Sequence, residues 1–305
     1  MKILMMSDLH LRDSGSRYRV DDFREAQFKK LEWCLQLAVK NNCDCFLQAG
    51  DWFDSVRASN QLISDTISLL NKYNIDVYAV SGNHDQRYRD NSLTNTPIKV
   101  LESAGVIKLL SGSPLDEGNV NIYGCHWGDE IPEIVDEAKF NALIIHKMII
   151  QNEDEKIWYG QTGYATSRMM LAKNKFDVIL SGDNHKSFID EYQGRLLFNL
   201  GSLTRLNVSQ LNHSPQIVLF DTDAKTYELF KVPIEPPENV FNLEEVEKAK
   251  KHKDENGKIK DYIDVLSQDA ETREWNFVSN LEEFVKSNGI KESVAKIIKS
   301  TLVEN

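Results

Sequence analysis

The stretch VYAVSGNHD, residues 77–85, decides the fold that we expect for this chain. It opens with a run of apolar and β-branched side chains, residues 77–80, which is typical of a buried strand. The tetrapeptide GNHD at residues 82–85 follows at once, and its glycine permits a sharp turn at the strand end. Few structural needs other than a metal site place these four residues together after a strand. The stretch therefore predicts a buried strand that delivers polar ligands at its carboxyl end.

Four further apolar runs end in the same kinds of residue. Residues 3–7 are followed by Asp8-x-His10, residues 45–49 by Gly50-Asp51-x-x-Asp54, residues 142–145 by His146, and residues 178–180 by Gly182-Asp183-Asn184-His185. Because sites in α/β sheets assemble outside the carboxyl ends of the strands, we expect these side chains to converge on one rim. A lone Asp-x-His is more often a turn and a surface histidine, and His146 alone would more often be a core residue. All the motifs in this order, each at a strand end, favour a metal site instead.

The apolar runs alternate with segments of helical spacing, residues 23–38 and 62–70. This alternation predicts an α/β core with right-handed crossovers. After Gly182 the chain changes to strands joined by turns, which predict a second, largely antiparallel sheet packed on the first: residues 188–192, 196–199, 216–221 and 227–232. A domain boundary is then marked by Pro233, Pro236 and Pro237. We therefore expect a catalytic domain over residues 1–235 and a helical region over residues 236–305 that binds a partner or caps the domain.

The donor types suit a pair of hard or borderline divalent metal ions such as Mn²⁺, because oxygen and imidazole ligands are present and thiolates are not. Two adjacent ions need a bridging carboxylate, and Asp51 is the natural candidate. Such a pair activates water and neutralises charge on a phosphoryl group, so no covalent nucleophile is required. The motifs therefore predict hydrolysis of phosphate esters.

Composition limits the classes of protein that fit. The net charge of −11 argues against a basic nucleic-acid-binding surface as a whole, although Arg12 and five further basic residues crowd the segment from 12 to 30. No apolar run approaches the roughly 20 residues that a membrane span needs, and the chain opens directly on a strand-like run, so we expect neither a membrane span nor a signal peptide. The four cysteines lack a zinc-ribbon spacing and predict buried, reduced thiols, which fits a cytoplasmic protein.

Taken together, the motifs Asp-x-His, Gly-Asp-x-x-Asp, Gly-Asn-His-Asp, His and Gly-x-x-His resemble the calcineurin-like metallophosphoesterase superfamily. Residues 199–205, NLGSLTR, resemble the Asn-Pro-Gly-Ser-x-x-Arg segment of SbcD-type DNA repair exonuclease subunits of bacteria and phages. The resemblance covers about residues 1–232. It implies a four-layer α/β/β/α sandwich with a small, mainly helical C-terminal appendage, located in the cytoplasm of a bacterium or of a phage-infected host cell.

The same resemblance implies roles for the strand-end residues. The implied metal ligands are Asp8, His10 and His185 for one ion, Asn83 and His146 for the other, and Asp51 shared by both. His84 would contact the scissile phosphate, stabilising charge or protonating the leaving oxygen, and Asp85 would orient its imidazole. The expected substrate contacts are Arg12, Lys186 and Arg205.

The chain departs from the family pattern at Asp183, where a histidine usually completes the second metal site. An aspartate can bind the same ion through oxygen, and its charge favours a harder metal such as Mn²⁺ or Mg²⁺. The alternative is that Asp183 caps a turn and the second site is weak.

The resemblance implies a DNA exonuclease or endonuclease that works in repair, recombination or replication with an SbcC-type coiled-coil ATPase. Residues 277–303 carry apolar stripes at helical spacing and predict a helical hairpin that docks on this partner or packs on its own chain. The sequence leaves the oligomeric state open, with a homodimer as one alternative. Two other functions stay open as well: a nucleotide phosphodiesterase or phosphoprotein phosphatase with the same metal chemistry, and a non-catalytic binding subunit.

Overall fold

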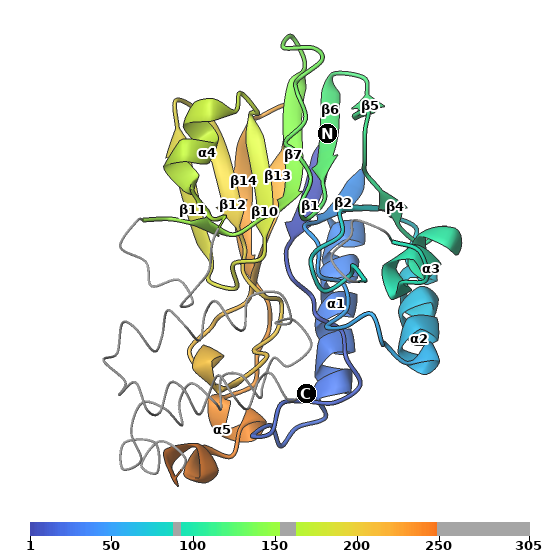
Figure 1. Cartoon of the computed structure of the whole chain (residues 1–305), viewed down its shortest axis with the longest axis vertical. Coiled ribbons are helices and arrows are strands. Elements are labelled where there is room, and N and C mark those ends of the chain that lie inside the picture. The colour runs from blue at the N-terminus through green and yellow to red at the C-terminus, as the bar shows by residue number, and fades with distance from the viewer. Residues whose placement is uncertain (88–92, 153–162, 249–305) are drawn as a thin grey trace, which may run out of the picture. The chain divides into compact units, whose positions relative to one another are not determined.

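The computed structural model of the chain describes residues 1–87, 93–152 and 163–248 (Figure 1). Up to Val246 these residues belong to one compact unit, formed by residues 1–155 and 163–246. A second unit comprises residues 156–162 and 247–305, and nearly all of it lies outside the described residues. The helical hairpin expected between residues 277 and 303 therefore stays a prediction, as does the C-terminal appendage.

The first sheet has six strands in the order β14-β13-β1-β2-β3-β4. Its parallel part consists of β1 (Lys2–Met6), β2 (Cys45–Gln48), β3 (Asp76–Ala79) and β4 (Lys108–Leu109). Helix α1 (Phe23–Lys40) connects β1 to β2 and α2 (Asn60–Asn71) connects β2 to β3, as parallel neighbours require. On the other side of β1, the antiparallel strands β13 (Gln216–Asp221) and β14 (Thr226–Lys231) complete the sheet.

The second sheet also has six strands, in the order β11-β12-β10-β7-β6-β5. Their bounds are β5 Leu115–Glu117, β6 Val120–Cys125, β7 Phe140–His146, β10 Val178–Gly182, β11 Phe188–Tyr192 and β12 Arg195–Asn199. The four central strands run parallel, and the two edge strands are antiparallel to their neighbours. A small separate ribbon pairs β8 (Ile149–Ile150) with β9 (Ala165–Thr166).

Two expectations about the sheets were wrong. Residues 142–145 and 178–180 lie in the second sheet and not in the first, whereas residues 216–231 return to the first. The second sheet is consequently mixed with a parallel centre, not largely antiparallel. The physical reason is that an apolar run marks a buried strand but carries no information about its neighbour. That neighbour depends on long-range register, such as Leu4 opposite Leu219.

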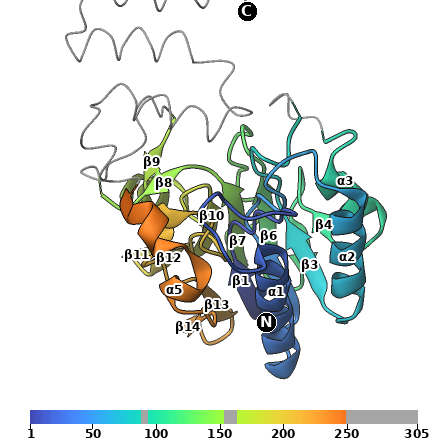
Figure 2. The same ribbon diagram turned by 90° about the horizontal axis from the view of Figure 1, so that it is seen from below.

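The alternation of side chains along the strands builds the layers. Ile3 and Met5 face the second sheet, where they join Ile144 and Phe198 in a buried cluster between the two sheets. The intervening Leu4 and Met6 face the other way, into a core shared with α1, α2 and α3 (Pro97–Ser103). Figure 2 shows these helices on one side of the strands. Helix α4 (Ser167–Lys173) covers the outer face of the second sheet with Met170 and Leu171. The α/β/β/α order is therefore confirmed.

Helix α1 shows why the local sequence folds as it does. The Asp22 side chain accepts a hydrogen bond from the N–H of Glu25 at 2.9 Å and so caps the first turn. Leu31, Leu35 and Ala38 recur at helical spacing and are fully buried against the sheet. No helix in the described ranges combines the length and apolarity needed to cross a membrane, and all four cysteines are free thiols.

The segment after the expected boundary at residue 235 still packs on the catalytic unit. Helix α5 (Pro237–Val240) is followed by Phe241, which is 1% exposed. The N–H of Val20 donates to the carbonyl of Val240 at 3.0 Å, and the N–H of Asn242 donates to the carbonyl of Tyr18 at 2.9 Å. The prolines interrupt regular structure here, and the compact unit continues past them to Val246.

Candidate metal centre

The carboxyl ends of β1, β2, β3, β7 and β10 bring their polar residues to one place. Although these strands belong to two sheets, the side chains that follow them form three overlapping groups that could each hold a metal ion: first Asp8, His10 and His185; second Asp8, Asp51 and His146; third His10, Asp51 and His84. Within each group the ligand atoms lie within 4.8 Å of one another. The structure therefore brings together six of the strand-end residues singled out in the sequence.

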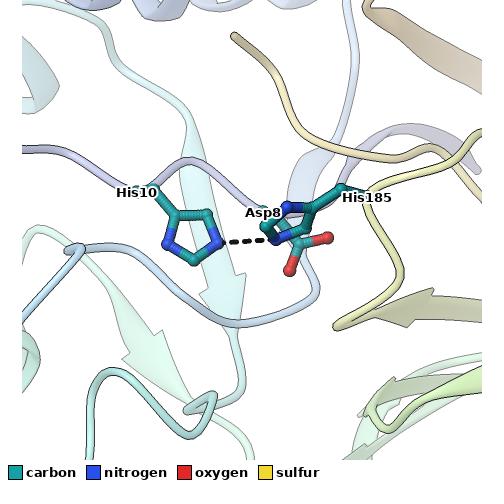
Figure 3. A group of neighbouring side chains, drawn as sticks. All are labelled: Asp8, His10 and His185. Atoms are coloured by element: carbon teal, nitrogen blue, oxygen red, sulfur yellow. Dashed lines mark hydrogen bonds between the residues drawn. The ribbon is translucent and has the colours of Figure 1, made fainter. Parts of the chain in front are cut away.

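The first group is Asp8, His10 and His185 (Figure 3). The Nε2 atoms of His10 and His185 are 3.0 Å apart, and their rings meet edge to face. Metal–nitrogen distances of about 2.1 Å place two ligand atoms roughly 3 Å apart when they form a right angle at the ion. The Oδ2 atom of Asp8 is buried and has no hydrogen-bond partner among the described residues. An unpartnered carboxylate oxygen beside two converging imidazoles fits a bound cation.

Asp51 lies between His10 and His146. Its Oδ2 atom is 3.3 Å from Nε2 of His10 and 3.5 Å from Nε2 of His146. Its Oδ1 atom accepts a hydrogen bond from the backbone N–H of His84 at 3.0 Å. One oxygen therefore faces the histidines of both groups, while the other is held by the turn after β3.

The second group is built around His146, which is 1% exposed. Its Nδ1 atom lies 2.7 Å from the carbonyl oxygen of Ala49, which fixes the ring with Nδ1 as the donor. Its Nε2 atom then points toward Oδ1 of Asn83, 3.1 Å away, and toward Asp51. Such a carbonyl contact is the usual way to set the tautomer of a metal-binding histidine.

Two glycines allow these groups to come so close. Gly50 has a φ of +88°, and a Cβ atom there would lie 2.4 Å from Nδ1 of His146. A Cβ atom on Gly82 would lie 2.0 Å from Oδ1 of Asp51. The glycines in Gly-Asp and Gly-Asn-His-Asp are thus required by the close approach of the turns as well as by their conformation.

The electrostatics of the site favour cations. Burial lowers the pKa of His10, but the carboxylates of Asp51, Asp54 and Asp8 outweigh it and raise that pKa to about 9. The same competition raises the pKa of His146 to about 9. His185 differs, since burial and the charge on His10 lower its pKa to about 3 and leave its ring neutral. Without metal, protons on His10 and His146 balance the carboxylates, and a bound divalent cation would take over that task.

The expected partnership of His84 with Asp85 was wrong. Nδ1 of His84 contacts the main-chain carbonyl of Asp54 at 2.7 Å. The Asp85 carboxylate instead accepts the backbone N–H groups of Gly82 at 3.0 Å and Trp52 at 3.2 Å. Among the described residues it makes no hydrogen bond to the His84 ring. In this tight turn the two neighbouring side chains leave the backbone in different directions, so Asp85 joins the turns after β2 and β3 instead.

His84 keeps its place in the site. Its ring lies edge to face with His10 at 4.8 Å between centroids, and it is only partly buried. It is close enough to His10 and Asp51 to share an ion with them. Its role as a phosphate contact stays a prediction, with ligation as the alternative.

Asp183 sits in a left-handed conformation with a φ of +82°. Its backbone N–H donates to Oδ1 of Asp8 at 2.9 Å. Burial raises its pKa, and its carboxylate in turn helps to raise the pKa of His146, so the two groups are close. The carboxylate belongs to none of the three groups and caps no backbone N–H within the described ranges. Both interpretations of Asp183, ligand and turn cap, stay predictions.

The three expected substrate contacts differ in their exposure and in their bonding partners. Lys186 is exposed directly beside His185, as a substrate contact requires. The guanidinium of Arg12 pairs with Asp54 at 3.1 Å, and Asp54 approaches Nδ1 of His10 to 3.4 Å, so Arg12 acts on the metal site through this carboxylate. Arg205 is 4% exposed and donates to the carbonyls of Leu211 and Glu235. Its buried guanidinium supports the fold through these two bonds, and its role as a substrate contact stays a prediction.

One supporting residue was missed. The side chain of Gln48 bonds the peptide of Gly50 twice, accepting from its N–H at 2.9 Å and donating to its carbonyl. These two hydrogen bonds stabilise the turn that carries Asp51. A polar glutamine inside the apolar run before the Gly-Asp motif was the available signal in the sequence.

These features define a metal-dependent phosphoester hydrolase with two sheets and a strand-end ligand cluster. The chain belongs to the calcineurin-like phosphoesterase family, whose sequence profile matches residues 1–187. Members of this family use divalent metal ions, and the candidate ligands are present here.

Individual relatives are DNA repair proteins. The chain is 28% identical over 203 residues to the DNA double-strand break repair protein Mre11 of Methanosarcina acetivorans, covering 61% of this chain and 31% of that protein. It is 35% identical over 115 residues to the Mre11 protein of Archaeoglobus fulgidus, covering 36% of this chain and 24% of that one. The chain thus spans about a third or less of the length of these relatives. A dimetal phosphatase from Danio rerio superposes on 77% of this chain and 99% of its own, with a TM-score of 0.47 and 11% identity.

Proposed function

We propose that this chain is a manganese-dependent nuclease that hydrolyses phosphodiester bonds in DNA. The observation that carries the proposal is the position of Asp51, whose Oδ2 lies 3.3 Å from the His10 ring and 3.5 Å from the His146 ring. This is the arrangement that a bridged pair of ions needs. The similarity to double-strand break repair proteins supports DNA as the substrate.

Each side chain has a distinct task in this proposal. One ion would be held by Asp8, His10 and His185, the other by Asn83, His146 and Asp183, with Asp51 between them. The bound ions would polarise the phosphoryl oxygens and lower the pKa of the attacking water. The Asp54 carbonyl holds His84 by Nδ1 and keeps Nε2 available for the scissile phosphate. From there His84 would stabilise charge or, when both ring nitrogens are protonated, give its Nε2 proton to the leaving oxygen.

Manganese is the proposed metal because the ligands are oxygens and imidazoles without thiolates. The carboxylate of Asp183, where the family usually has histidine, adds a hard donor near His146. Magnesium would also accept an oxygen-rich second site.

The test of this function compares substrates. The purified full chain is incubated with Mn²⁺ and linear DNA, a chromogenic phosphodiester, a nucleotide diester or a phosphopeptide, with chelator-treated protein as the control. Cleavage of DNA that requires Mn²⁺ supports the proposal. Turnover of the nucleotide or phosphopeptide without DNA cleavage would establish the phosphatase or nucleotide phosphodiesterase alternative. Metal binding without turnover of any substrate would support the third alternative, a non-catalytic binding subunit.

We also propose an SbcC-type coiled-coil ATPase as the partner and the cytoplasm as the compartment. The proposed attachment lies in residues 277–303, beyond the described residues. A chain ending at Lys248 should hydrolyse a small diester at the full-length rate and no longer co-purify with the ATPase.

The truncation must keep residues 237–246, because this segment packs on the catalytic unit. A chain ending at Glu235 lacks Val240 and Phe241, which are 3% and 1% exposed. It should melt at a lower temperature than the chain ending at Lys248, because loss of one buried phenylalanine side chain alone costs about 3–5 kcal/mol. If the longer truncation still bound the ATPase at full stoichiometry, the proposed attachment would be refuted.

Asp183 offers a direct test of the second site. Asp183→Ala should weaken the binding of one Mn²⁺ and leave the other unchanged, and Asp183→His should shift that site toward Zn²⁺. Titration with both metals measures this, with Asp65→Ala as a control on a partly exposed carboxylate of α2 that pairs with Arg24. Unchanged metal content and kinetics in Asp183→Ala would favour the turn cap.

A further inference from the structure

We infer that Asn199 is a positioning residue that sets the first metal group by holding the loop that carries His185. The inference rests on the metal site of the proposed function. Asn199 ends β12 and is fully buried, with 0% exposure. Its neighbour across the parallel pair is Ser181, the next-to-last residue of β10. The loop from Asp183 to Lys186 leaves β10 at that point.

The amide of Asn199 makes three hydrogen bonds. Its Nδ2 atom donates to the carbonyl of Asn184 and to the carbonyl of Lys186, both at 2.6 Å. Its Oδ1 atom accepts from the hydroxyl of Ser181 at 2.9 Å. The two carbonyls are those of the residues on either side of His185, so one side chain fixes the backbone from which this imidazole projects.

The loop depends on such external support because it is not part of a strand. Asp183 already has a φ of +82°, which is costly for a residue other than glycine. A fixed backbone matters here, since Nε2 of His185 lies 3.0 Å from Nε2 of His10, which is close enough for both to bind one ion. The hydroxyl of Ser7 donates to the carbonyl of Ser181 at 2.7 Å and joins the end of β1 to the same network.

The residues after Asn199 extend the support to Asp8. Gly201 has a φ of +71°, and a Cβ atom there would lie 2.5 Å from the carbonyl oxygen of His185. The N–H of Leu203 donates to the carbonyl of Asp8 at 2.8 Å. Residues 199–203 thus contact the backbones of two of the three residues in the first group.

The second group is held by other contacts. The His146 ring is fixed by the carbonyl of Ala49, and the Asp51 carboxylate by the N–H of His84. Asp183, the second-site residue in the same loop, is held separately, because its backbone N–H donates to Oδ1 of Asp8 at 2.9 Å. Loss of the Asn199 amide should therefore weaken one metal site and spare the other. A residue that served only stability would weaken both sites or neither.

The experiment compares Asn199→Ala with Asn141→Ala in the full chain. Asn141 is a matched control because it is 2% exposed and its Nδ2 also donates to two main-chain carbonyls, those of Asp136 and Lys139. It lies at the start of β7, whereas the metal groups gather at the strand ends. Mn²⁺ affinity is measured by calorimetry, and electron paramagnetic resonance separates a coupled ion pair from a single ion.

Asn199→Ala should bind one Mn²⁺ like the wild type and the other about 10–100-fold more weakly, the range for residues that support metal ligands. It should show a single-ion spectrum at concentrations where the wild type shows a coupled pair. His185→Ala provides the reference spectrum for loss of the first group. Asn141→Ala should lower the melting temperature and keep both affinities.

Two wild-type affinities in Asn199→Ala, or an equal loss of metal in Asn141→Ala, would overturn the inference. Ser181→Ala is the milder second variant if Asn199→Ala does not fold, since it removes one bond to the amide and should weaken the same site about fivefold. An unchanged first site in Ser181→Ala would count against the inference. If the wild type itself bound no Mn²⁺, the proposed function would fail, which is a separate outcome.

Discussion

Asp51→Asn should nearly abolish hydrolysis and the binding of both metal ions while the fold stays intact. Only one oxygen, Oδ2, faces both His10 and His146, and the other is engaged by the N–H of His84. An amide of the same shape offers a single oxygen. If that oxygen faces the ions, its NH₂ group meets the N–H of His84. If it accepts from His84, the NH₂ group faces the ions and cannot bind them.

Metal content per chain and the rate with a chromogenic diester measure this effect. The loss of affinity should exceed the roughly 100-fold seen when an outer partner of a ligand is removed. Asp65→Asn is the matched control, because this carboxylate on α2 pairs with Arg24 at 2.5 Å outside the metal groups. Two bound ions and a wild-type rate in Asp51→Asn would show that the site is assigned to the wrong residues.

His84→Ala should keep both ions and lose about 10²–10⁴-fold in turnover, the range for a positioned general acid or base. The Asp54 carbonyl holds this ring by Nδ1 at 2.7 Å, and the ring is less buried than those of His10 and His146. A histidine held in this way at the edge of the site can reach a substrate without taking a coordination position.

The contrast with His185→Ala decides between the two roles of His84. The His185 variant should lose metal as well as activity, since its Nε2 converges with that of His10 at 3.0 Å. Comparable metal loss in His84→Ala would make His84 a ligand, an option that its closeness to His10 and Asp51 keeps open. Metal titration beside steady-state kinetics separates the two outcomes.

Local sequence determined which residues form the site. Strands rich in β-branched residues ending in Asp, His or Asn predicted a rim of ligands, and the structure brings Asp8, His10, Asp51, His146 and His185 together there. This succeeds because strand formation, a glycine turn and a side-chain donor are all properties of a few consecutive residues. The fold class and the family followed from the same motifs.

Tertiary structure alone decided which strands pair and which side chains hydrogen-bond to one another. The strands after residue 182 divide between two sheets, and β13 pairs with β1 across more than two hundred residues, because register is chosen by the whole core. In the same way, the carbonyl of Asp54 and not the Asp85 carboxylate contacts the His84 ring, and Asn199 donates to the carbonyls on both sides of His185. Hydrogen bonds between distant turns depend on how the sheets meet, and no local pattern of residues encodes that distance.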